Sequence, residues 1–183
     1  MYFLDASSGA LRVQVRQEEA SFSYQGHHLT DCVDFRVYFD KPTGLAGYCK
    51  ATLWVSCPDH NVMDITMQIR KINAAGKALA HLNYPCPVSE SDVPDVNTQP
   101  NVEQSLIAPG TRVRLEIPIW PIGMVFEEGE GILLRVAGHD LCLPESEACW
   151  LKEPEYANVG RHIMHIRGAF DSSLTIPFIL AGE

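Results

Sequence analysis

The sequence lacks any run of about 20 consecutive apolar residues, the length that a helix needs to cross a membrane. Its first five residues, Met1 to Asp5, contain neither the basic start nor the apolar stretch of a secretory signal. Apolar residues make up 46% of the chain and charged residues 20%, as in globular proteins. These features predict a cytoplasmic protein that does not enter the membrane.

Positive charge is scarce. The chain has 14 basic and 23 acidic residues, which gives a net charge of -9, and the basic residues are scattered along it. Such a surface repels a phosphate backbone, so the sequence argues against nucleic-acid binding.

No Cys-x-x-Cys pair occurs among the six cysteines, and their spacing fits no zinc ribbon or finger. His60 stands near Asp59 and Asp64, but this spacing matches no known zinc or iron pattern either. We therefore expect no metal site and no cofactor. Cys49 and Cys57 lie in apolar runs and are expected to be buried, reduced thiols.

Helical periodicity is missing over any stretch longer than two turns, and alternation with period two replaces it. Apolar residues alternate with polar ones from Arg112 to Ile119 and from Asp64 to Arg70, which is typical of half-buried strands. Further strands are expected at residues 11–15, 33–39, 48–55, 132–136, 162–167 and 173–180.

Turn signals separate these strands. Asn73 to Gly76 is typical of a hairpin connection, and Pro109-Gly110 opens the next strand. Many short strands with Gly and Pro turns predict an all-β sandwich or barrel, and no linker interrupts residues 1–183, which we expect to form one domain.

Two segments, 85–108 and 139–161, show little alternation. Loops of this length tend to be lids, binding loops or partner contacts, although a purely structural loop fits them equally well.

Several strings occur in an order that resembles one family. They are GYCKATLWVS at 47–56, RKINAAGK at 70–77, IPIWPIG at 117–123, NVGRH at 158–162 and FDSSL at 170–174. Together they resemble the C-terminal domain of CocE/NonD-type hydrolases and X-Pro dipeptidyl-peptidases. This resemblance implies a mostly antiparallel jelly-roll sandwich, similar to galactose-binding domains, which packs beside an α/β-hydrolase domain that carries the nucleophile.

This chain departs from the family pattern in two ways. It contains no Gly-x-Ser-x-Gly nucleophile elbow. In place of a basic strand after the Gly76 hairpin, it has an acidic, proline-rich stretch from Pro85 to Asp92. The second departure suggests that this domain acts independently, because the segment that would help to dock a hydrolase domain has been replaced.

Histidines are the first candidates for chemistry, because they titrate near neutral pH. His139 and Asp140 follow a strand end, where loops often carry function. His162 and His165 are three apart on an expected strand, so their side chains should point to opposite faces and cannot share a metal. We therefore take His139, Asp140 and His165 as catalytic candidates and His162 as structural.

Large apolar side chains are the candidates for substrate binding. They could line a pocket between the sheets, although a sandwich core needs such residues in any case. The candidates are Tyr48, Trp54, Met67, Trp120, Met124 and Phe126.

Two functions fit these features. In the first, the domain binds an apolar small molecule and promotes a cofactor-free cyclisation or isomerisation, as in natural-product biosynthesis, by holding the substrate in a reactive conformer. In the second, it is a non-catalytic module that binds a protein partner, a carbohydrate or another copy of itself. A third possibility is that the chain is a domain excised from a longer hydrolase, with Met1 as an engineered start.

Overall fold

The computed structural model describes residues 1–5, 7–14, 19–28, 30–79, 107–139, 141, 158–166 and 168–179, and leaves out the side chain of Trp120. These residues form eleven strands and no helix. The strands are β1 (Tyr2–Asp5), β2 (Ala10–Arg12), β3 (Ala20–Gln25), β4 (Cys32–Tyr38), β5 (Thr43–Ser56), β6 (Thr66–Ile72), β7 (Val113–Phe126), β8 (Gly131–Ala137), β9 (Arg161–Ile166), β10 (Ser173–Thr175) and β11 (Phe178–Ile179).

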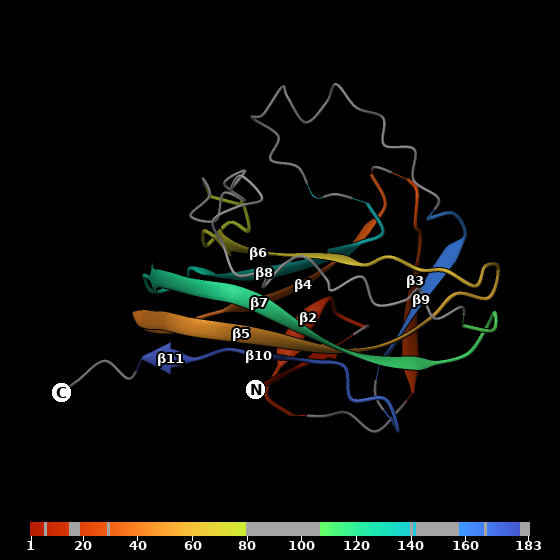
Figure 1. Cartoon of the computed structure of the whole chain (residues 1–183). Coiled ribbons are helices and arrows are strands. Elements are labelled where there is room, and N and C mark those ends of the chain that lie inside the picture. Colours follow the sequence, from red (N-terminus) through yellow and green to blue (C-terminus); the bar gives the residue numbers. More distant parts are fainter. Residues whose placement is uncertain are drawn as a thin grey trace, which may run out of the picture.

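The strands lie in two layers (Figure 1). In one layer β5 pairs along one edge with β7, and along its other edge with β11, β10 and β9 in turn. In the other layer β8 lies between β4 and β6. β1 and β2 join the layers through β10 and β4, and the β2–β4 contact is the one parallel pairing among the described strands. The chain is therefore an all-β, mostly antiparallel sandwich, as the sequence predicts.

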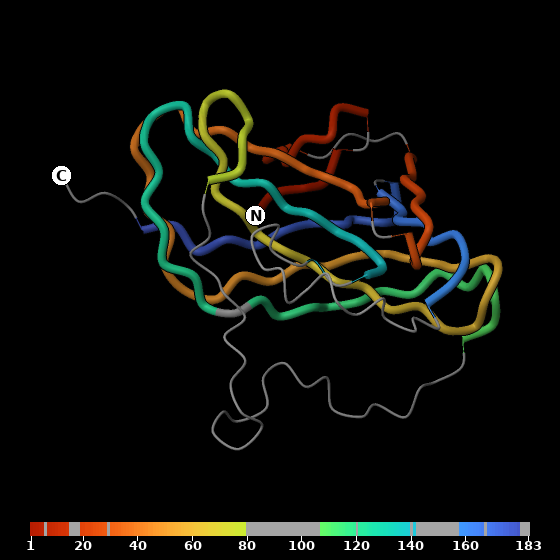
Figure 2. Tube along the Cα trace, turned by 90° about the horizontal axis from the view of Figure 1, so that it is seen from above, coloured from red at the N-terminus to blue at the C-terminus, as the bar shows by residue number. Residues whose placement is uncertain are grey.

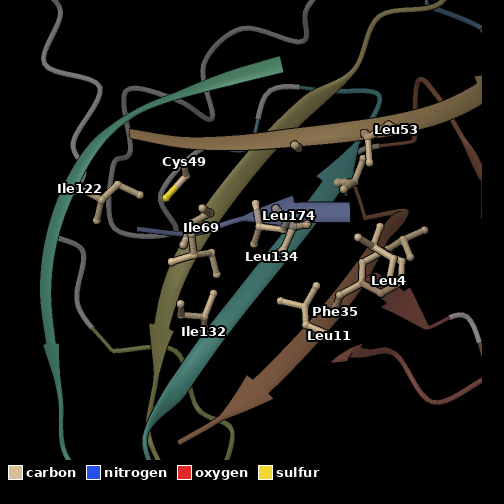
Figure 3. Packing of buried hydrophobic residues seen from close by; sticks show 14 of the residues in the cluster. Leu4, Leu11, Phe35, Cys49, Leu53, Ile69, Ile122, Ile132, Leu134 and Leu174 are labelled. Carbon is tan, nitrogen blue, oxygen red and sulfur yellow. The ribbon is translucent and has the colours of Figure 1, made fainter. Parts of the chain in front are cut away.

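Alternation along the strands builds the core between the layers. Cys49, Ala51, Leu53 and Val55 of β5 point into the core. The alternating residues point to the outer face, where Tyr48 is exposed and Thr52 and Ser56 are buried. Residues from the opposite layer meet them, and Figure 3 shows this packing around Leu53, Leu134 and Leu174. Each fully buried side chain of this size stabilises the fold by about 1.5–3 kcal/mol.

The long pair β5–β7 extends beyond the strands that the sequence predicts (Figure 2). β5 begins at Thr43 and absorbs a bulge between Gly47 and Cys49, where Gly47 has a φ of 129°. β7 continues through Pro118 and Pro121 because β5 is its one partner among the described strands, which leaves the other edge free of ladder bonds. The expected strand at 173–180 is split into β10 and β11 at Ile176 and Pro177.

Cys49 and Cys57 are buried free thiols, as predicted, and burial raises the pKa of Cys49 to about 11. The described residues include no helix that is long and apolar enough to cross a membrane. Most of the two irregular segments, with Pro85 to Asp92, lies outside the described residues.

Candidate functional site

His162 and His165 point to opposite faces of β9, as their spacing predicts. The side chains of His162, Met164 and Ile166 face the core, and His162 has no exposed surface. His165 is half-buried on the outer face, where it lies opposite Trp54 of β5 and Ser21 of β3. The two imidazoles are therefore separated by the sheet itself.

His165 lies at the centre of a polar contact between β5 and β9. Its Nε2 shares a hydrogen bond of 2.8 Å with Oγ of Ser56. Ser172 adds a second link, because its hydroxyl donates to the backbone oxygen of His165 at 2.7 Å and accepts from the Trp54 N–H at 3.0 Å. Burial, and secondarily the nearby Arg112, lower the pKa of His165, which favours the neutral ring.

Aromatic and cationic groups surround this pair. Phe170 packs edge-on against Trp54, with ring centroids 5.2 Å apart, and its centroid lies 5.6 Å from that of His165. The guanidinium carbon of Arg112 stands 4.5 Å from the centroid of Phe170. A neutral histidine beside a serine could accept its proton, but no carboxylate within the described residues hydrogen-bonds to this ring.

His139 lies just after β8 and is 5% exposed, so its ring belongs to the interior. The backbone beside it is tightly packed, because Asn158 donates to the Gly138 oxygen at 2.5 Å. Asp140 lies outside the described residues, so the expected pairing of His139 with Asp140 stays a prediction.

His162 is enclosed rather than placed for chemistry. Tyr24 packs edge-on against it, with ring centroids 5.2 Å apart, and neither ring nitrogen has a hydrogen-bond partner among the described residues. Burial, with smaller contributions from His27 and His60, lowers the pKa of His162 to about 4. The ring is thus neutral at physiological pH, which agrees with the structural role expected for it.

The apolar candidates do not converge on one described cavity. Met124 and Phe126 are buried in the core, where Phe126 contacts Phe39. Met67 is half-buried against the core, Trp54 faces outward, and Tyr48 is 72% exposed at the β5 bulge. The position of the Trp120 side chain is not described.

Over the described ranges, no group of three or more His, Cys, Asp or Glu side chains is arranged to hold a metal ion. Asp59 instead accepts the Arg161 N–H at 2.8 Å. The backbone N–H of Asp64 donates to the Asn158 side chain at 2.8 Å. Both residues therefore fix the loop that leads from β5 to β6.

A family model, the X-Pro dipeptidyl-peptidase C-terminal non-catalytic domain, matches residues 18–175. The chain belongs to this family. No curated protein matches the chain at a significant level.

Solved structures support the same fold for this member of the X-Pro dipeptidyl-peptidase C-terminal non-catalytic domain family. A CocE/NonD family hydrolase from Staphylococcus aureus aligns with a TM-score of 0.80 and 22% identity, covering 98% of this chain and 36% of the hydrolase. An aminopeptidase from a marine sediment Thaumarchaeota archaeon aligns with a TM-score of 0.63 and 12% identity, covering 98% of this chain and 37% of the other. An α-amino acid ester hydrolase aligns with a TM-score of 0.60 and 10% identity, covering 97% and 36%. The chain thus spans little more than a third of these proteins.

Sequence reasoning selected His165 but missed its partners, Ser56, Arg112, Phe170 and Ser172. Ser56 and His165 are separated by 109 positions, and only the β5–β9 pairing brings them together. The alternation of β5 could have placed Ser56 on the face of Trp54, since the two residues are two apart on one strand.

Proposed function

We propose that this chain is a non-catalytic accessory domain that packs against an α/β-hydrolase domain, carried either on the same polypeptide or on a separate one. The departure at Pro85 to Asp92 favours a domain that acts alone, but two findings favour a hydrolase partner. The family to which the chain belongs is described as non-catalytic, and the chain spans about a third of the hydrolases that share its fold. The hydrolase domain supplies the catalytic groups, and this domain supplies a rigid surface beside them.

An exposed apolar strip on the sandwich carries this proposal. Gly44 of β5 pairs with Val125 of β7 on one side and with Ile179 of β11 on the other. Val125 is 68% exposed and Ile179 is 55% exposed. Exposed apolar side chains grouped on adjoining strands favour contact with another protein.

Small residues lie along the strip. Ala46, two residues along β5, pairs with Gly123, and a side chain added at Gly123 would meet nothing within 4 Å. Small residues therefore lie between the larger side chains, and Tyr48 stands exposed further along β5. A partner domain can approach such a surface closely because small residues lie there, and β5 beneath it is hydrogen-bonded along both edges.

Crosslinking of the tagged chain in its native cells, followed by mass spectrometry, tests the proposal. We expect crosslinks to an identified α/β-hydrolase domain, and we expect the Val125→Arg/Ile179→Arg variant to lose them because two cations enter the apolar contact. Val13→Arg is the matched control, since Val13 is 69% exposed outside the strip. Its crosslinks should persist, and the melting temperatures of all variants should agree.

Three results would contradict the proposal. One is a wild-type chain that crosslinks to no hydrolase domain. Another is a double variant that keeps its crosslinks. The third is a homodimer that the double variant dissociates, which would make a second copy of the chain the occupant of the strip.

The cyclisation or isomerisation function requires an enclosed apolar pocket. The described part of the chain offers no observation that favours it, because Met124 and Phe126 pack into the core while Tyr48 and Trp54 face outward. The exposed strip favours the accessory function instead.

A further inference from the structure

A groove with a volume of about 390 Å³ lies on the outer face of the β5 layer, beyond the apolar strip. It crosses four neighbouring strands, β1, β10, β5 and β7. At a strand spacing of roughly 4.8 Å, it is about 14 Å wide. The residues that matter most here are Phe3, Lys50, Thr52, Trp54, Arg114 and Ser173.

Hydroxyl groups form the floor of the groove. Thr52 and Ser173 lie directly opposite each other on β5 and β10, and Thr175 lies opposite Lys50. Thr52 is 9% exposed and Ser173 5% exposed, so both hold fixed positions in the sheet. Neither hydroxyl makes a hydrogen bond to another described group, which leaves both available to a ligand.

Aromatic side chains stand on two sides of this floor. Trp54 follows Thr52 on the outer face of β5, and Phe170 packs against it and limits its rotation. Phe3 of β1 pairs with Ser173 and borders the floor on the β1 side. An indole fixed in this way offers a preorganised apolar surface beside hydrogen-bonding groups.

The basic side chains of the groove are neutralised by carboxylates. Lys50 and Arg114 line it, and both bind Glu116, which lies beside the lining, at 3.4 Å and 2.7 Å. Asp171 is the carboxylate of the lining itself. The charges of these four side chains sum to zero, and the side chains supply both donors and acceptors.

These features select a ligand class. A nucleic acid or an acidic peptide needs an excess of positive charge, and an apolar ligand would leave the hydroxyl floor without partners. An uncharged molecule with apolar faces and many hydroxyls satisfies the floor, the aromatic sides and the balanced charges together. We infer that this groove binds a neutral oligosaccharide, a role beyond the accessory function proposed above.

Titration of the isotope-labelled full chain with cellotriose, maltotriose, mannotriose and triacetylchitotriose, followed by NMR, tests this inference. We expect at least one trisaccharide, at concentrations up to about 10 mM, to shift the amide signals of Thr52 and Ser173. Thr52→Val removes one floor hydroxyl with little change of shape and should weaken binding about threefold or more. Trp54→Ala should weaken binding about tenfold.

Matched variants separate the groove from the rest of the surface. Thr111→Val removes an exposed hydroxyl outside the groove. Tyr48→Ala removes an exposed aromatic ring from β5, the strand that carries Trp54. Both should bind like the wild type. The inference is overturned if no trisaccharide shifts these amides, if Thr52→Val and Trp54→Ala bind like the controls, or if trigalacturonate binds more tightly than every neutral trisaccharide.

Discussion

His162 is completely buried, and its ring lies against Tyr24 and the backbone of Gly26. Its pKa of about 4 in the folded chain lies below the value of 6.5 for an unperturbed histidine. As pH falls below 6.5, His162 therefore becomes protonated in the unfolded chain but stays neutral in the folded chain. Folding stability due to this residue is complete above pH 6.5 and is lost between pH 6.5 and 4, by roughly 3 kcal/mol.

We expect His162→Gln to remove this part of the pH dependence. Urea unfolding at several pH values between 7.5 and 4.5 would measure it, and the slope of unfolding free energy against pH should fall by up to about 1.4 kcal/mol per pH unit. His28→Gln, which replaces an exposed imidazole, is the control. An unchanged slope in His162→Gln would show that the folded chain protonates this ring as readily as the unfolded chain does.

At the scale of the element, glycines decide how closely strand ends approach. Gly26 follows β3, and a Cβ placed there would come within 2.5 Å of the His162 ring and of the Asn158 backbone oxygen. Gly123 lies inside β7 and would meet nothing within 4 Å. Substitution by alanine should therefore affect stability differently at the two positions.

Gly26→Ala should destabilise the chain by about 1–3 kcal/mol, because backbone and ring must both move. Gly123→Ala should be neutral or stabilise it by roughly 0.5–1 kcal/mol, because alanine loses less conformational freedom in a strand. Thermal or urea unfolding measures both changes. Equal destabilisation by the two variants would contradict this account of the packing.

At the scale of the whole molecule, Asn158 ties the two layers together. It stands before β9 of one layer, and its side chain holds Asp64, before β6, and Gly138, after β8, in the other. It donates to both backbone oxygens and accepts the Asp64 N–H, and it has no exposed surface. Loss of this amide leaves three backbone groups without their partner.

Asn158→Ala should reduce the unfolding free energy by about 3 kcal/mol, because buried groups lose their hydrogen bonds. Asn73→Ala is the matched control, since Asn73 accepts two backbone N–H groups in an exposed hairpin, and should reduce stability by about 1 kcal/mol or less. Chemical unfolding compares the two. Similar losses in both variants would show that Asn158 does not link the layers.

The strands could be predicted from alternation alone where each has one buried face, as in β6 and β9. The start of β5 and the end of β7 could not, because glycines and prolines there hide the pattern while the pairing of the two strands sustains the ladder. Candidate residues were chosen by residue type, and this selected His165. Its contacts with Ser56 and Arg112 could not be predicted, because these residues lie far from it in the sequence.

The sequence by itself determined the all-β class, the burial of Cys49 and Cys57, the opposite orientations of His162 and His165, and the family, because periodicity and ordered motifs are local properties of the chain. Only the tertiary structure decided which outward-facing residues become neighbours. The apolar strip joins Gly44, Val125 and Ile179, and the hydroxyl floor joins Thr52 and Ser173, through pairings between strands far apart in sequence. The pairing register between strands produces these surfaces, and the sequence of one strand alone does not determine that register.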